Sequence, residues 1–264
     1  MLINTVILLL RDGLPIVFML VLLLVTMRRV QTKSDSTRWL VKAIFITTFV
    51  TTILLTFIDT VAHWYDGMGI ELLFSLAFIS VYILILTYLF ASTVVKQQKL
   101  KYNSAIGIFV IVVSVNTINF LVYLTGFWSQ TELLISILTG MLLGVGICVS
   151  VGILLYFLLQ LNAQRIQIRI NNLLLLIFGC GQLTQALHLL SQIDLLPATT
   201  AVWDSGFLIN ENSELGYFFT ALVGYDARPT GLHISLYIFA LLLPIAFYYG
   251  QKRYLNTTPH QEHN

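Results

Sequence analysis

Long apolar segments separated by short polar connections are the feature that most constrains how this chain of 264 residues can fold. A helix needs about 20 mainly apolar residues to cross the hydrocarbon core of a bilayer. We predict seven such spans, at residues 2–27, 40–62, 72–95, 105–124, 133–159, 173–190 and 232–249. The sequence therefore predicts an all-α membrane protein, with a single transmembrane domain over residues 1–264.

The composition agrees with a lipid bilayer as the solvent of this chain. Apolar residues make up 58% of the sequence and charged residues only 10%, whereas about a quarter of a soluble domain is charged. Arg11 interrupts the first apolar run instead of preceding it, so we expect residues 2–27 to be a span and not a cleaved signal peptide. Cys148 and Cys180 are interpreted as small core residues. The charge gives no sign of nucleic-acid binding.

The basic residues predict the orientation of the spans, since Lys and Arg are retained on the cytoplasmic side. Of the 14 basic residues, 12 fall in the first, third and fifth connections and in the C-terminal tail. They are Arg28, Arg29, Lys33, Arg38, Lys42, Lys96, Lys99, Lys101, Arg165, Arg169, Lys252 and Arg253. The N-terminus is therefore predicted outside and the C-terminus inside, and we expect the cytoplasmic (inner) membrane of a bacterium.

The opposite face of the predicted bundle is acidic. Its acids are Asp59, Asp66, Glu71, Glu132, Asp194, Asp204, Glu211, Glu214 and Asp226. Two interpretations are open: acids accumulate wherever Lys and Arg are excluded, or they concentrate cations at the membrane. The longest connection, residues 191–231, carries aromatic residues and prolines, which predicts short interfacial helices over the outer mouth.

The first span contains the strongest candidate for a functional site. Arg11 and Asp12 lie near its middle, where a charged residue is costly and its presence is a functional hypothesis. Pro15 has no N–H for the carbonyl of Arg11, so we predict a break or kink that frees oxygen ligands for a cation beside Asp12. The alternative is a structural kink, with Arg11 paired to an acid on a neighbouring helix.

The fourth span also holds polar side chains near its middle, namely Asn116, Thr117 and Asn119. Such residues commonly make hydrogen bonds between helices, and contact with a substrate is the second interpretation. These three residues are predicted to lie along the transport path.

The sixth and third spans complete the set of candidate residues. Gln185 and His188 are three residues apart on one helical face, so a polar stripe is predicted to face the bundle interior. His188 is either a hydrogen-bonded structural residue or a metal ligand. Glu71 opens the third span, either as an interfacial residue or as the first acid that an incoming cation meets.

Three stretches of the chain resemble a known family. They are MLINTVILLLRDGLP at the N-terminus, QALHLLSQIDLLP at residues 185–197, and Val202-Trp203-Asp204 followed by LVGYDARPT at residues 222–230. They resemble the high-affinity iron permeases of the oxidase-dependent iron transporter type, which include bacterial EfeU-like and fungal Ftr-type permeases. The resemblance covers essentially the whole chain.

The resemblance implies seven helices with the N-terminus outside, arranged as an inverted 3+3 repeat plus one helix. It implies a site where the first and fourth helices cross, iron as cargo without a resident cofactor, and an extracytoplasmic iron-delivery or oxidase protein as a possible partner. The family has an Arg-Glu-x-x-Glu motif in each of these helices. Here Asp12 replaces the first glutamate and Pro15 the second. Asn116, Thr117 and Phe120 stand at the matching positions of the fourth helix, so one carboxylate of the four remains.

These features favour a permease-like transporter of iron or a related metal cation. Asp12, Glu71 and His188 are the predicted metal ligands, with Arg11, Pro15, Asn116, Thr117, Asn119 and Gln185 along the path. The alternative function is a non-transporting subunit that scaffolds or regulates a membrane complex. A haem protein is a weaker hypothesis, because His63 and His233 lie near the outer boundary and away from His188 in the predicted spans. No enzyme motif is found, so no enzymatic activity is predicted.

Overall fold

The computed structural model describes residues 2–30, 38–93, 98–125, 131–160, 164–197, 200–210 and 213–257. Its helices are α1 (Leu2–Val30), α2 (Arg38–Ala62), the short 3-10 helix η1 (Trp64–Gly67), α3 (Gly69–Thr93), α4 (Gln98–Thr125), α5 (Thr131–Gln160), α6 (Gln164–Gln192), α7 (Glu214–Val223) and α8 (Gly231–Thr257). Within the described ranges there is no strand, only an isolated bridge between Ala201 and Thr230. The all-α prediction is confirmed.

Six helices, α1 to α6, are long and apolar enough to cross a membrane. Each contains or closely overlaps one of the first six predicted spans, and residues 94 and 95 of the third span lie outside the described residues. The seventh predicted span, 232–249, falls within α8, whose apolar part Gly231–Pro244 is shorter than the six others. The structure therefore supports an integral membrane protein with six candidate spans.

The helices begin earlier than the apolar pattern predicts, which moves several basic residues from the connections into helices. Lys99 and Lys101, expected in the third connection, lie in the first turns of α4. Lys101 is buried, and its Nζ lies 5.0 Å from the centroid of the Tyr88 ring. This cation–π contact keeps the charge of Lys101 next to an aromatic face instead of bare hydrocarbon.

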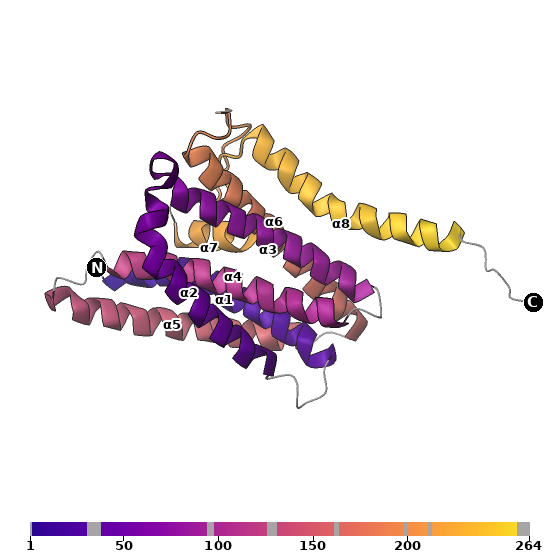
Figure 1. Cartoon of the computed structure of the whole chain (residues 1–264), viewed down its shortest axis with the longest axis horizontal. Coiled ribbons are helices and arrows are strands. Elements are labelled where there is room, and N and C mark those ends of the chain that lie inside the picture. The colour runs from indigo at the N-terminus through magenta and orange to yellow at the C-terminus, as the bar shows by residue number, and fades with distance from the viewer. Residues whose placement is uncertain are drawn as a thin grey trace, which may run out of the picture.

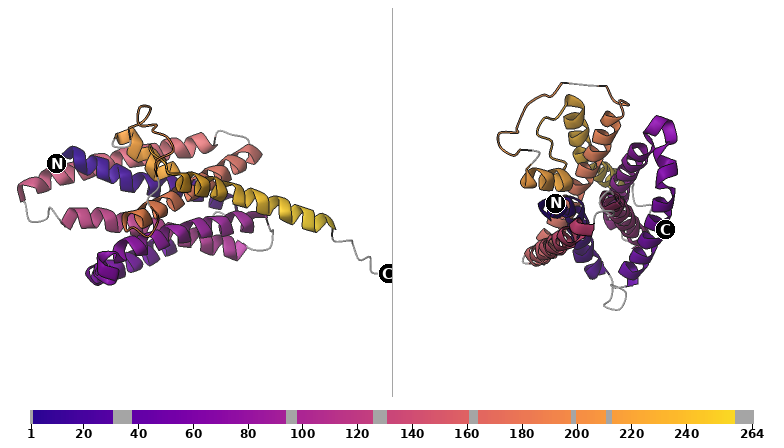
Figure 2. Two further views of the ribbon diagram at one scale, coloured as in Figure 1. Left: turned by 90° about the horizontal axis from the view of Figure 1, so that it is seen from above. Right: turned by 90° about the vertical axis from the view of Figure 1, so that its left-hand side faces the viewer.

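The long helices lie side by side, and α8 diverges from them toward its C-terminus (Figures 1 and 2). Helix α1 packs against α4, α5, α6 and α7, while α3 packs against α4 and α6, and α2 packs mainly on α4. Helix α8 contacts α6, and the Tyr82 hydroxyl of α3 donates a hydrogen bond to the carbonyl of Ala240 at 2.8 Å. α1 therefore contacts both α4 and α6, and α3 packs against the same two helices.

Glycines on one face of α5 allow a close approach of α1. A Cβ on Gly144 would lie 2.9 Å from the Leu9 side chain, and one on Gly152 would lie 2.5 Å from the Val17 side chain. A Cβ on Gly140 would lie 2.9 Å from the carbonyl oxygen of Leu2. Small residues four apart bring membrane helices into direct backbone contact, where dispersion forces stabilise the pair.

A comparable stripe of small or short side chains joins α2 to α4. Ala43, Thr47 and Thr51 are buried at four-residue intervals along α2. The hydroxyl of Thr51 donates a hydrogen bond to the Ser114 hydroxyl at 3.1 Å. The hydroxyl of Thr47 bonds back to the carbonyl of Ala43 at 2.7 Å, so it brings no unsatisfied donor into the interface.

Of the predicted break or kink at Pro15, the break is wrong, because α1 runs as one helix from Leu2 to Val30 with Pro15 inside it. The φ angle of proline is compatible with a helix, so the local penalty is the missing N–H and crowding against the preceding turn. The tight packing of α1 on the glycine face of α5, on both sides of Pro15, constrains the helix to continue. Pro15 itself is buried.

Candidate functional site

A cavity of about 340 Å³ lies where α1, α3, α4, α6 and the end of α7 meet. Six of the residues predicted from sequence line it: Arg11, Asp12, Asn116, Asn119, Gln185 and His188. Four further polar residues line it as well: Thr184, Thr220, Tyr225 and Asp226. Helices far apart in the sequence thus bring most of the predicted polar residues to one place.

The cavity contains an ion pair between chain neighbours. The Arg11 Nε donates a hydrogen bond to Asp12 Oδ1 at 2.9 Å, and a second guanidinium nitrogen lies 3.4 Å from Oδ2. The Asp12 side chain is 8% exposed and that of Arg11 is 43% exposed. Arg11 is therefore paired with Asp12 and not, as the structural alternative had it, with an acid on a neighbouring helix.

The α4 and α6 walls of the cavity carry amides. Asn116 is buried, and its Nδ2 donates to the carbonyl of Val112 one turn earlier at 2.7 Å. Because this bond uses one amide proton, the rest of the Asn116 amide is the part that can face a ligand. Asn119 and Gln185 add two more amides, which supply neutral oxygen and N–H groups to the cavity.

Three predicted residues do not line this cavity. Pro15 is buried in the helix packing, and Thr117 is half-buried on α4. Glu71 lies in the first turn of α3, where its buried Oε2 has no hydrogen-bond partner within the described residues. Across the same residues there is no group of three or more His, Cys, Asp or Glu side chains that could hold a metal ion. Asp12, Glu71 and His188 are thus not gathered into one three-ligand site.

The end of α7 forms one wall of the cavity because two glycines touch. Gly224 ends α7 in a left-handed conformation with φ of 73°, and its N–H and that of Tyr225 cap the helix on Thr220 and Phe219. A Cβ on Gly224 would lie 2.7 Å from the Cα of Gly181 on α6. Only glycine allows both this turn and this approach, which place Tyr225 and Asp226 beside the polar face of α6.

Asp226 connects the loop after α7 to α8. Its Oδ2 lies 3.1 Å from Nδ1 of His233, and its Oδ1 accepts the backbone N–H of Arg228 at 2.8 Å. The hydrogen bond from His233 is the main cause that holds the pKa of Asp226 below its usual value, with the Arg228 N–H adding to it and partial burial opposing it. Asp226 therefore remains an ionised acceptor between the two groups.

His188 of α6 lies next to this pair. The rings of His188 and His233 have centroids 6.1 Å apart with an interplanar angle of 47°. The His233 side chain is 7% exposed, whereas His188 is exposed. A second cavity, of about 350 Å³, is lined by both histidines and Asp226, so Asp226 and His188 belong to both cavities.

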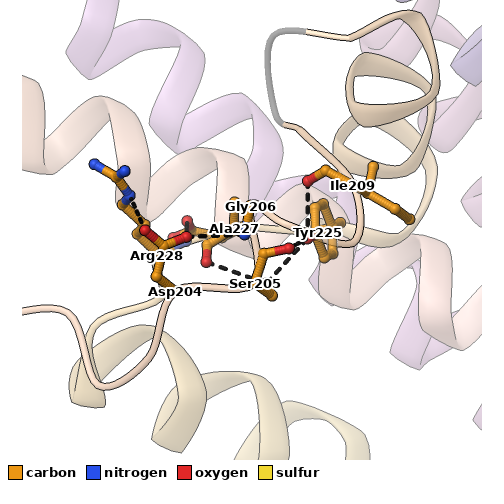
Figure 3. A network of polar contacts seen from close by, with 8 residues as sticks. Asp204, Ser205, Gly206, Ile209, Tyr225, Ala227 and Arg228 are labelled. Atoms are coloured by element: carbon orange, nitrogen blue, oxygen red, sulfur yellow. Dashed lines mark hydrogen bonds and ion pairs between the residues drawn. The ribbon is translucent and has the colours of Figure 1, made fainter.

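The two outer segments singled out in the sequence are hydrogen-bonded to each other (Figure 3). The Ser205 N–H donates to the carbonyl of Ala227 at 2.8 Å, and the Ser205 hydroxyl lies 3.0 Å from the Tyr225 hydroxyl. Arg228 Nε donates to Asp204 Oδ2 at 2.9 Å. The backbone N–H of Gly206 on Asp204 is the main cause of the lowered pKa of this exposed carboxylate. These contacts fix the loop from which Tyr225 and Asp226 reach the cavity.

Sequence reasoning missed Tyr225, Asp226 and His233 as site residues. All three follow the helix end at Gly224; Asp226 was noted only among the acids and within the stretch LVGYDARPT, and His233 only in the haem hypothesis. The glycine before Tyr225 and Asp226 could have been read from the sequence as a helix end. That these residues lie beside α6 depends on the contact between Gly181 and Gly224, which the sequence does not show. A short helix in the longest connection, as predicted, is found in α7, which packs on α1 and α6; its position on the outer side of the membrane stays a prediction.

No family model, no curated protein and no solved structure matches this chain. The relation to iron permeases expected from the sequence therefore stays a proposal, and the geometry of the cavity is the main basis for assigning a function.

Proposed function

We propose that this protein is a permease-like transporter that moves iron or a related metal cation across the cytoplasmic (inner) membrane of a bacterium. The observation that carries the proposal is the cavity at the meeting of α1, α4 and α6, which is lined by six of the nine residues assigned to the metal site and path. An ion pair and several polar side chains gathered in a cavity among apolar membrane helices are costly unless they serve a ligand or ion pathway.

The arrangement of the helices supports an inverted 3+3 repeat. Exchanging α1 with α4, α2 with α5 and α3 with α6 maps each contacting pair among these six helices onto a contacting pair, although α3–α4 is more extensive than its counterpart α1–α6. For example, α1–α5 becomes α4–α2, and α3–α4 becomes α6–α1. The small-residue stripes of α5 and α2 are also exchanged by this operation. In transporters built this way the substrate site lies between the two repeats, which is where the cavity lies.

The proposed orientation has the N-terminus outside and α8 as the seventh span. It rests on 12 of the 14 basic residues lying on one side of the spans. The cavity lies nearer the other side, since it is lined by the first half of α1, the last half of α6 and the end of α7. A cation would reach it from the acidic outer face.

The donor set suits a divalent cation better than trivalent iron. Asp12 is already paired with Arg11, and the remaining groups are three amides, two hydroxyls of threonine, Tyr225, the His188 imidazole and Asp226. Hard trivalent ions prefer several carboxylates, while imidazole suits divalent iron, zinc and copper. We therefore propose Fe²⁺ or another divalent metal ion as the cargo.

The test is uptake of Fe²⁺ into proteoliposomes that enclose an iron-sensitive dye. The wild-type protein is expected to give influx above that of empty vesicles, and Asp12→Asn is expected to reduce it about tenfold or more, as loss of one charged ligand implies. Asp66→Asn is the matched control, because Asp66 is exposed in η1 and outside the cavity. Influx that is absent, or equal in Asp12→Asn and wild type, contradicts the transport site.

The non-transporting alternative makes a different prediction for the same sample. A scaffold or regulatory subunit would be folded, show no influx, and co-purify with a partner in mild detergent. Loss of transport together with a stable complex would favour that function over the permease proposed here.

A further inference from the structure

We propose a second metal-binding site at the mouth of the cavity, in which His188 and His233 bind one divalent cation and Asp226 orients His233. The site differs from the Asp12 region, and it uses a histidine that the sequence did not connect with His188. Its support is geometric: two imidazoles from α6 and α8 face a shared polar cavity of about 350 Å³.

The carboxylate of Asp226 determines which nitrogen of His233 is free. Ionised Asp226 can only accept a hydrogen bond, so Nδ1 of His233 must carry the proton in their 3.1 Å contact. In the neutral form that binds a metal, such a ring has its lone pair on Nε2. A carboxylate that accepts the N–H of a histidine in this way is the usual partner of a metal-ligating histidine, since it fixes the tautomer and raises the basicity of the ligand.

The distance between the rings is close to what a shared cation needs. An ion about 2.0–2.1 Å from one nitrogen of each ring allows ring centroids up to about 6.4 Å apart when the nitrogens lie opposite each other, and about 5 Å at a tetrahedral angle, so a tetrahedral ion needs a turn of the His188 ring toward His233. The observed separation of the His188 and His233 centroids is 6.1 Å. His188 is exposed and can rotate, while His233 is buried and held by Asp226, so one ligand is fixed and the other is adjustable.

The surroundings of the pair support positive charge. Asp226 and Asp194 both line the second cavity, and Ser191 and Thr230 add hydroxyls there. Arg228 also lines it, but its Nε is paired with Asp204 at 2.9 Å. With two protein nitrogens, water molecules would complete the coordination of the cation. Such a site exchanges its ion more easily than a structural site with four protein ligands, as the entrance of a transport path requires.

Copper(II) is the probe for this site, because it binds nitrogen ligands most strongly among the divalent first-row metals and its EPR spectrum reports coordinated imidazole nitrogens. The full chain is purified in detergent without a histidine tag, in a His260→Ala, His263→Ala background that removes the histidines of the C-terminal tail. We expect one strongly bound Cu²⁺ per chain, with coupling to two nitrogens.

His188→Ala and His233→Gln are each expected to weaken Cu²⁺ binding about tenfold or more and to remove one nitrogen from the spectrum. Gln at position 233 keeps a donor for Asp226, which preserves the buried contact. Asp226→Asn should weaken binding without loss of a nitrogen. The control is His63→Ala, since His63 is exposed and its Nδ1 lies 2.6 Å from the carbonyl of Asp59 on its own helix.

Unchanged affinity and an unchanged spectrum in either His188→Ala or His233→Gln would overturn this site. The proposal does not rest on transport, because Cu²⁺ binding is measured at equilibrium on the purified chain. Asp12→Asn is expected to leave the two-nitrogen spectrum intact. A protein that binds Cu²⁺ through both histidines but moves no Fe²⁺ would refute transport and keep this site.

Discussion

Arg11 and Asp12 are consecutive residues of α1 whose side chains meet in the central cavity, with Nε and Oδ1 2.9 Å apart. Adjacent residues of a helix point about 100° apart, so only the long arginine side chain allows this contact. The charge of the Asp12 carboxylate is therefore largely neutralised by Arg11. Arg11 therefore opposes the binding of a cation beside Asp12, and its removal should have a measurable effect.

Arg11→Gln is predicted to increase the affinity of the cavity for Fe²⁺ about tenfold or more. A unit charge about 4 Å away contributes up to about 4 kcal/mol at an effective dielectric constant of 20, and the partial exposure of Arg11 reduces this value. Asp12→Asn should decrease the affinity. Titration calorimetry with Fe²⁺ under anaerobic conditions measures both. The control is Arg169→Gln, which removes an exposed arginine of α6 that lines neither cavity. Weaker binding in Arg11→Gln would contradict a cation site at Asp12.

Gly224→Ala and Gly181→Ala are each predicted to destabilise the protein by about 2–4 kcal/mol. Alanine at position 224 would need φ near 73° and would place its Cβ 2.7 Å from Gly181 Cα, and alanine at 181 would place its Cβ 2.8 Å from Gly224 N. Because each added Cβ would meet backbone atoms, neither alanine fits unless α7 moves away from α6. Thermal unfolding in detergent measures the loss. Gly146→Ala is the matched control, because nothing lies within 4 Å of its added Cβ, and it should be neutral or slightly stabilising.

Asp226→Asn is predicted to lower the free energy of unfolding at pH 7 by about 1–2 kcal/mol. The pKa of Asp226 is lowered in the folded protein, chiefly by the hydrogen bond from His233. Its contribution is therefore complete above the unfolded pKa and is lost as the pH falls through the folded pKa. The titratable and charged groups around it are His233, His188, Arg228 and Asp194.

Unfolding curves of wild type and Asp226→Asn between pH 7 and pH 3 check this dependence. The difference between the two proteins should persist to about pH 4 and then narrow on further acidification. A difference that grows as the pH falls below about 4 would show that the carboxylate stabilises the fold in its protonated form, contrary to the contact with His233.

Asp66→Cys is predicted to react with a membrane-impermeant maleimide added outside intact cells, and Lys99→Cys is predicted to react only after the membrane is opened. Both residues are exposed. Asp66 lies in η1, just before α3 begins, and Lys99 lies in the first turn of α4, just after α3 ends, so one span separates them. Cys148→Ala and Cys180→Ala provide the background, since both native cysteines are buried. The reverse labelling pattern would place the N-terminus in the cytoplasm.

The apolar spans and many of the cavity residues could be predicted because both depend on local pattern. Arg11, Asp12, Asn116 and His188 stand out as polar groups within apolar segments, and such groups turn toward the protein interior in lipid. The same local argument failed for Pro15. Its effect on α1 is decided by packing against the glycine face of α5, which no pattern within the first span contains.

By itself the sequence determined that the chain forms long apolar helices and which polar residues those helices carry, since hydropathy and helical period act within one segment. Only the tertiary structure decided that Arg11 pairs with Asp12, and that Asp226 and His233 meet His188 across the cavity mouth. Those contacts require α7 to end against α6 through Gly181 and Gly224. Close packing of distant segments is a property of their joint shapes, which the order of residues in any one segment does not reveal.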